Sequence, residues 1–148
     1  MSADRLRVVL DTNVIVSGVM AASGHPAQII DVWRQGRFLL LVSPEIVNEV
    51  RTVLLSPKIR GTGRVTEEQC ERLLLELATT SELAMHGPEL AVRSRDEKDD
   101  YVLGCAFGGR ADYLVTGDQD LLVLDGEPAL AGLRILTPKA FSEVITRR

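Results

Sequence analysis

The sequence predicts an α/β fold with a mostly parallel central sheet, and two observations support this prediction. Short runs of strand-forming residues alternate with helical patterns along the chain, which is typical of strands joined by crossover helices. Residues 38–42 (FLLLV) form a continuous apolar run, as expected of a strand covered on both faces. The 148 residues contain no evident repeat or linker, so we expect a single domain over residues 1–148.

Three elements are predicted in the first third of the chain. Residues 6–10 (LRVVL) predict a buried first strand. Residues 26–34 predict a helix because their apolar side chains recur at helical spacing. The apolar run at 38–42 predicts the second strand.

Two helices and a loop are predicted in the middle of the chain. The Ser-Pro pair at 43–44 opens a helix, because serine caps a helix N-terminus and proline is tolerated in the first turn. The apolar stripe of this helix consists of Ile46, Val47, Val50, Val53 and Leu54. Residues 56–65 are expected to form a loop because of their proline and glycine content. A capping box of Thr66 and Gln69 then predicts a helix that runs to about residue 79.

Four elements are predicted in the last third. A helix starts at residues 99–100 (DD), where the helix dipole favours negative charge, and stops at residues 108–109 (GG). Residues 113–116 (YLVT) and 133–136 (LRIL) predict the last two strands. The Thr-Pro pair at 137–138 begins a C-terminal helix.

The composition excludes several functional classes. A net charge of −4, from 17 Lys+Arg against 21 Asp+Glu, argues against holding nucleic acid by bulk basicity. Two histidines and two cysteines leave little room for a zinc site, and we expect the thiols to be reduced. Three Phe, two Tyr and one Trp are too few for an extended base-stacking platform. No apolar run reaches the roughly 18 residues of a membrane span, so we expect a cytoplasmic protein without membrane contact.

Acidic residues gather at one edge of the predicted sheet. Asp11 follows the first strand, Asp118 follows the third, and Asp99 and Asp100 begin a helix. In a parallel α/β sheet, strand carboxyl ends and helix amino ends share the edge at which ligands bind. Three widely separated acidic positions are therefore expected to converge there.

Glu49 adds a fourth acidic position, because it borders the apolar stripe about 9 Å along its helix and its carboxylate can lean over the same edge. Four carboxylates brought together repel one another, and Mg²⁺ or Mn²⁺ relieves this repulsion because these ions prefer carboxylate and water ligands. Such ions lower the pKa of a bound water and hold a scissile phosphate. The sequence offers no good alternative nucleophile or histidine base. These residues therefore predict a metal-dependent phosphodiester hydrolase.

Four segments also carry a resemblance to a known family: VVLDTNVIVSG at 8–18, SPEIVNEVRTVL at 43–54, RDEKDDYVLGCA at 95–106 and ADYLVTGDQDLL at 111–122. Together, in this order over nearly the whole chain, they resemble the PIN domain family, and more closely the PIN-family toxin components of bacterial toxin–antitoxin systems. The resemblance implies a compact three-layer α/β/α sandwich and a Mg²⁺- or Mn²⁺-dependent ribonuclease acting on RNA. It also implies common homodimerisation and often an antitoxin protein as partner.

Carried over residue by residue, the resemblance places the acidic tetrad, which holds the metal and serves catalysis, on Asp11, Glu49, Asp100 and Asp118. Asn13 and Thr116 match polar residues that orient acids or water in the family. Asp120 matches a further acid that some members use near the metal.

The third acid of the tetrad has an alternative. Asp96 and Asp99 crowd Asp100, and a register slip of one residue would exchange Asp99 with Asp100. Asp100 is preferred because YVLGCA then aligns with the helical segment that follows the third acid in the family.

Each candidate also has a purely structural interpretation. Asp100 could cap a helix, Asp118 could belong to a Gly-Asp turn, and Glu49 could pair with Arg51 or Arg37. Five basic residues are either solvated charges or a rim that positions phosphate: Lys58, Arg60, Arg64, Arg93 and Arg95. The alternative function is a PIN-fold module that binds RNA or a partner protein without cleavage. Loss of an acid would favour this alternative, and all four acids are present.

Overall fold

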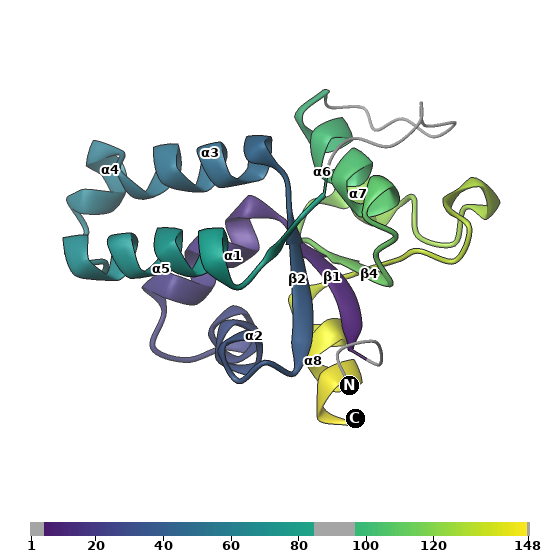
Figure 1. The fold of residues 1–148 in the computed structure, drawn as a ribbon, viewed down its shortest axis with the longest axis horizontal. Coiled ribbons are helices and arrows are strands. Elements are labelled where there is room, and N and C mark those ends of the chain that lie inside the picture. Colours follow the sequence, from purple (N-terminus) through teal and green to yellow (C-terminus); the bar gives the residue numbers. More distant parts are fainter. Residues whose placement is uncertain (1–4, 85–96, 148) are drawn as a thin grey trace.

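The computed structural model describes residues 5–84 and 97–147, which contain five strands in one sheet (Figure 1). The strand order is β3–β2–β1–β4–β5, and all neighbouring strands are parallel. The strands are β1 (Leu6–Leu10), β2 (Phe38–Val42), β3 (Glu82–Leu83), β4 (Tyr113–Val115) and β5 (Arg134–Leu136). The helices are α1 (Thr12–Met20), α2 (His25–Arg34), α3 (Pro44–Leu54), α4 (Pro57–Arg60), α5 (Glu67–Thr79), α6 (Glu97–Gly108), α7 (Gln119–Leu122), α8 (Pro138–Thr146) and the 3₁₀ helix η2 (Pro128–Leu130).

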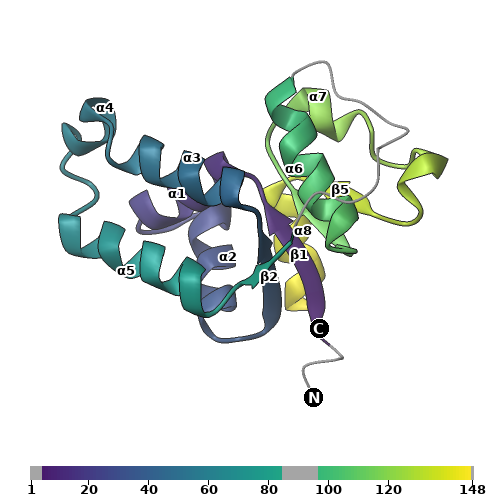
Figure 2. The same ribbon diagram turned by 45° about the horizontal axis from the view of Figure 1, so that its top comes forward.

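Helices cover both faces of the sheet, which confirms the predicted three-layer α/β/α architecture (Figures 1 and 2). On one face, the ring centroid of Phe141 in α8 lies 5.6 Å from those of Phe38 and Tyr113, and α2 packs against α8. On the other face, Gly109 at the end of α6 lies against Leu41 of β2. The apolar residues of β1 and β2 form the centre of the core between these layers.

The helices α3, α4 and α5 extend away from the sheet (Figure 1). The predicted start of α3 is confirmed, because the Ser43 hydroxyl accepts the Ile46 N–H at 3.2 Å. The predicted capping box of α5 is also confirmed: Gln69 N donates to Thr66 Oγ1 at 3.1 Å, and Thr66 N donates to Gln69 Oε1 at 2.8 Å. Within the described ranges, no helix is long and apolar enough to cross a membrane.

Some boundaries differ from the prediction. The segment 56–65 is not wholly a loop, because it contains the one-turn helix α4, capped by the Ser56 hydroxyl, which accepts the Ile59 N–H at 3.4 Å. Helix α6 begins at Glu97, two residues earlier than predicted, because glutamate and lysine at 97–98 are good helix formers. The elements α1, β3, α7 and η2 were not predicted.

Candidate active site

Asp11 lies at the carboxyl end of β1, as predicted. Its backbone N–H donates to Val115 O of β4 at 2.9 Å, so the chain stays paired with the sheet before it turns into α1. The side chain is only 8% exposed and does not cap α1. Instead, its Oδ2 accepts a hydrogen bond of 2.7 Å from the Thr116 hydroxyl. The Asp11 carboxylate is therefore held against the end of β4.

Thr116 and Asp118 continue this network after β4. The buried Thr116 hydroxyl also accepts the backbone N–H of Asp118 at 3.0 Å. Asp118 is half-buried, and its Oδ1 accepts the backbone N–H of Asp120 at 2.9 Å, which makes Asp118 the N-cap of α7. Thr116 thus hydrogen-bonds to the carboxylate of one candidate acid and to the backbone of another.

The charges of three candidate acids act on one another. Burial raises the pKa of Asp11 above its ordinary value of 3.8, and the negative charges of Glu49 and Asp118 raise it further. The hydrogen bonds from the Thr116 hydroxyl and the Thr12 backbone N–H oppose this rise. Three carboxylates from three different elements are therefore close enough to interact electrostatically at the carboxyl edge of the sheet.

Glu49 contributes from α3, whose first turn follows β2 directly. The side chain is half-buried and forms no hydrogen bond or ion pair with the described residues. The alternative pairing with Arg37 is not formed, because the Arg37 guanidinium donates to Ile145 O at 3.1 Å. Nor does Arg51 form an ion pair with Glu49 in the part of the chain that the structure describes.

Asp100 lies in α6, which runs antiparallel to the strands. The end of this helix is near the start of β1, because Arg7 Nε donates to Gly109 O at 3.0 Å. The helix therefore begins toward the carboxyl edge, where the other acids lie. Asp100 is half-buried and is the fourth residue of α6 rather than its cap. Asp99 is the third residue of the helix, and Asp96 lies outside the described residues.

The remaining candidates have different surroundings. Asn13 is exposed at the start of α1 and hydrogen-bonds to no other described side chain. Asp120 is half-buried in the first turn of α7. Thr12, which sequence patterns did not single out, directly follows Asp11 and has a buried hydroxyl with no hydrogen-bond partner among the described residues. Its only sequence signal is its position directly after a candidate acid.

A divalent ion fits this donor set chemically, although the described residues do not form a closed metal site. Among residues 5–84 and 100–147, whose side chains the structure describes, no three His, Cys, Asp or Glu side chains are grouped closely enough to hold an ion. However, burial and neighbouring negative charges disfavour the ionised form of Asp11, and a bound cation would favour it. Carboxylate oxygens are the ligands that Mg²⁺ and Mn²⁺ prefer.

The basic residues of segment 56–65 lie away from this edge. Helix α4 follows the far end of α3, which is about 16 Å long at 1.5 Å per residue (Figure 1). Arg60 lies 3.9 Å from Glu67, and both side chains are exposed. Lys58, Arg60 and Arg64 are therefore better explained as solvated charges than as a rim that positions phosphate at the acids. Arg93 and Arg95 lie outside the described residues.

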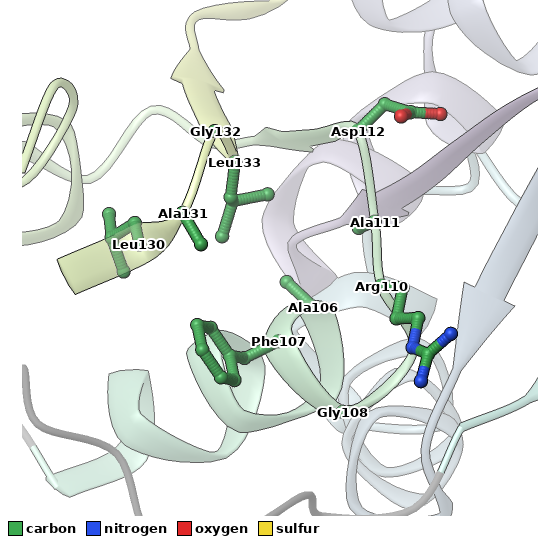
Figure 3. Close-up of a pocket in the computed structure, with 10 residues that line it drawn as sticks. All are labelled: Ala106, Phe107, Gly108, Arg110, Ala111, Asp112, Leu130, Ala131, Gly132 and Leu133. Atoms are coloured by element: carbon green, nitrogen blue, oxygen red, sulfur yellow. The ribbon is translucent and has the colours of Figure 1, made fainter. Parts of the chain in front are cut away.

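A hollow of about 570 Å³ opens elsewhere, near the end of α6 and the segment before β5 (Figure 3). Its lining is mostly apolar and includes Ala106, Phe107, Leu130 and Leu133. None of the candidate acids lines it. The hollow is thus separate from the acidic edge.

Comparison with known proteins identifies relatives of the whole chain. A family model described as PIN domain matches residues 7–120. The uncharacterized protein MJ1680 from Methanocaldococcus jannaschii is 30% identical over 149 residues, which covers 97% of this chain and 94% of the relative.

Two solved structures share the fold. VapBC2 from Rickettsia felis, bound to a DNA fragment from their promoter, aligns with a TM-score of 0.52 at 13% identity. FitAcB from Neisseria gonorrhoeae aligns with a TM-score of 0.52 at 20% identity. Each alignment covers 89% of this chain and 98% of the other. Because the family model spans most of the chain, including the positions of all four candidate acids, the chain belongs to the PIN domain family.

Proposed function

We propose that this protein is a Mg²⁺- or Mn²⁺-dependent ribonuclease that hydrolyses RNA phosphodiester bonds. The proposed metal-holding and catalytic residues are Asp11, Glu49, Asp100 and Asp118. The observation that carries the proposal is the buried position of Asp11 near the carboxylates of Glu49 and Asp118. Burial and these two negative charges disfavour the ionised form of Asp11. Such an arrangement costs stability in a metal-free protein, and it is typical of sites that bind cations. Membership of the PIN domain family supports the same reading.

Each group of the chain has a defined task in this proposal. When bound, the divalent ion supplies an activated water at neutral pH and offsets the charge of the phosphate. The Thr116 hydroxyl keeps Asp11 Oδ2 oriented, and the Asp120 N–H keeps Asp118 Oδ1 oriented. Glu49, which has no partner among the described residues, remains available as a ligand or proton acceptor. Asn13 and the Asp120 carboxylate are proposed to support the site.

We further propose that the protein acts as a single domain and as the toxin of a toxin–antitoxin pair. Its partners would be an antitoxin protein and a second copy of the chain. The resemblance of its four motifs to PIN-family toxin components supports this assignment, and the VapBC2 structure shows that a protein of this fold takes part in an assembly on promoter DNA.

The test is cleavage of single-stranded RNA by the purified protein with Mn²⁺ or Mg²⁺. We expect cleavage that is lost with EDTA and in Asp11→Asn, while circular dichroism shows an intact fold. The matched control is Asp31→Asn, which changes an exposed acid on α2 and should cleave normally. Equal activity of Asp11→Asn and wild type would overturn the proposed site. RNA binding without cleavage of any RNA would favour the non-cleaving module.

A further inference from the structure

Tyr101 is the one aromatic side chain of this chain that is exposed. All six aromatic side chains lie in the described part of the chain. Five are buried or half-buried: Trp33, Phe38, Phe107, Tyr113 and Phe141. Tyr101 is 43% exposed, although it directly precedes a buried stretch of α6 that runs from Val102 to Ala106. Its ring is therefore partly open to solvent, next to the buried part of α6.

The path of α6 places this point beyond the carboxyl edge of the sheet. The end of the helix lies near the start of β1, where Arg7 donates to Gly109 O. Four residues before Gly109, the Cys105 side chain lies close to that of Ser43, the residue that directly follows β2. Tyr101 lies four residues earlier still, which is about 6 Å further along the helix axis. Residue 101 is thus on the side of the sheet where the proposed catalytic acids lie, and it directly follows Asp100 in the chain.

We propose that the ring of Tyr101 stacks on a nucleobase of single-stranded RNA next to the scissile phosphate. The proposal rests on the proposed ribonuclease function and assigns the substrate contact that positions RNA at that site. Only unpaired bases can leave the helical stack to contact a side chain in this way, so the substrate is single-stranded RNA.

The negative net charge of the protein gives a reason for an aromatic contact with RNA at the carboxyl edge of the sheet. With a net charge of −4 and several carboxylates at the edge, the chain offers little electrostatic attraction to the RNA backbone. Stacking is an uncharged source of binding energy, and it accepts every base because each base has a π-face. One exposed ring suffices for one base, so the small number of aromatic residues is no obstacle.

Substitution of Tyr101 tests the proposal. We expect Tyr101→Ala to weaken binding of a labelled single-stranded RNA by about 5- to 100-fold, measured by fluorescence anisotropy. The KM for cleavage with Mn²⁺ should rise by a similar factor, while kcat and the affinity for Mn²⁺ change little. Tyr101→Phe keeps the ring and should behave as wild type. The matched control is Leu75→Ala, which removes an apolar side chain that is 64% exposed on α5, away from the site.

A second measurement needs no variant. RNA that carries 4-thiouridine next to the cleaved bond should crosslink to the wild-type protein, and the crosslinked peptide should contain Tyr101. Unchanged RNA affinity and KM in Tyr101→Ala, or crosslinked peptides without Tyr101, would overturn this inference. If the wild type still cleaves RNA in that case, the ribonuclease proposal remains valid. Wild-type protein that neither binds nor cleaves RNA would overturn both.

Discussion

Thr116 joins two candidate acids through one buried hydroxyl. It donates to Asp11 Oδ2 at 2.7 Å and accepts the backbone N–H of Asp118 at 3.0 Å. The side chain is fully buried, so no water can replace either bond without a change in packing. The direction of the Asp11 carboxylate is therefore coupled to the backbone at the start of α7.

Thr116→Val tests this coupling, because valine has nearly the same shape and lacks the hydroxyl. Asp11 Oδ2 and the Asp118 N–H would lose their partner, and the pKa of Asp11 would rise further. We expect the free energy of unfolding in urea to fall by about 1–3 kcal/mol. Calorimetric affinity for Mn²⁺ should fall by about 10-fold or more. Thr116→Ser keeps the hydroxyl and is the control, and wild-type Mn²⁺ affinity in Thr116→Val would refute the orienting role.

At the scale of residues, the sequence suggested the candidate acids and Thr116, but not the hydrogen bonds that connect them. Asp11 and Asp118 follow runs that local patterns assign to strands, so their common edge could be inferred. The bond between Thr116 and Asp11 joins residues 105 positions apart and requires β1 to pair with β4. The Thr12 hydroxyl is buried and has no partner in the described part of the chain, yet nothing in the local sequence distinguishes it from an ordinary threonine in a first helical turn.

Gly18 of α1 packs tightly against α2. A Cβ atom here would lie 2.7 Å from the Pro26 carbonyl oxygen and would also meet Ile30 Cγ1. A backbone atom cannot move aside as a side chain can, so Gly18→Ala should lower the free energy of unfolding by about 1–3 kcal/mol. This loss outweighs the better helix propensity of alanine, which is about 1 kcal/mol. Ser17→Ala, at an exposed position of α1, should leave urea unfolding nearly unchanged; a more stable Gly18→Ala would contradict the close approach.

Asp125 ties the segment after α7 to β5. Its Oδ1 accepts hydrogen bonds from Arg134 Nε at 3.0 Å and from Ile135 N at 2.9 Å, and its Oδ2 accepts one from Arg134 Nη2 at 3.2 Å. The hydrogen bond with Arg134 lowers the pKa of Asp125 below 3.8. Because the folded pKa is lower than the unfolded one, this stabilisation is present above pH 3.8 and is lost as the pH falls through the folded pKa.

Asp125→Asn should therefore destabilise the protein in a pH-dependent way. At pH 7 we expect the free energy of unfolding to fall by about 1 kcal/mol, a modest effect because the pair is partly exposed to solvent. The difference from wild type should shrink in urea titrations well below pH 3.8. Glu127→Gln, at a nearby exposed acid, should show neither effect. The same difference at both pH values would contradict the ionic origin of the stabilisation.

At the scale of elements, the long helices with a local start signal were predicted, whereas the one-turn helices α4 and α7, which also have capped starts, were not. Helices α3 and α5 carry Ser-Pro and Thr–Gln caps, which the structure confirms. Strand β3 has two residues and exists because it pairs with β2 and because Glu82 forms an ion pair with Arg7 of β1. The β-branched run at 14–16 favours a strand locally, yet it lies in α1, where it packs into the core.

At the scale of the whole molecule, the sheet order collects residues that are far apart in sequence. The alternating pattern predicted a parallel sheet, but local patterns do not specify that β1 lies between β2 and β4. This order makes the ends of β1 and β4 neighbours and places the start of α3 beside them. Asp11, Asp118 and Glu49 interact electrostatically as a consequence.

That convergence predicts how a metal ion affects the stability of the entire fold. A bound cation reduces the repulsion around Asp11, and an ion that binds only the folded protein stabilises it by about 2.7 kcal/mol at 100 times its Kd. For a chain of this size, saturating Mn²⁺ should raise the Tm by about 5–10 °C in a thermal melt. Asp11→Asn removes the most buried candidate ligand and should abolish most of the shift, whereas Asp31→Asn should keep it. An undiminished shift in Asp11→Asn would place the stabilising ion elsewhere, because a site that includes Asp11 cannot bind Mn²⁺ equally well after its carboxylate is replaced by a neutral amide.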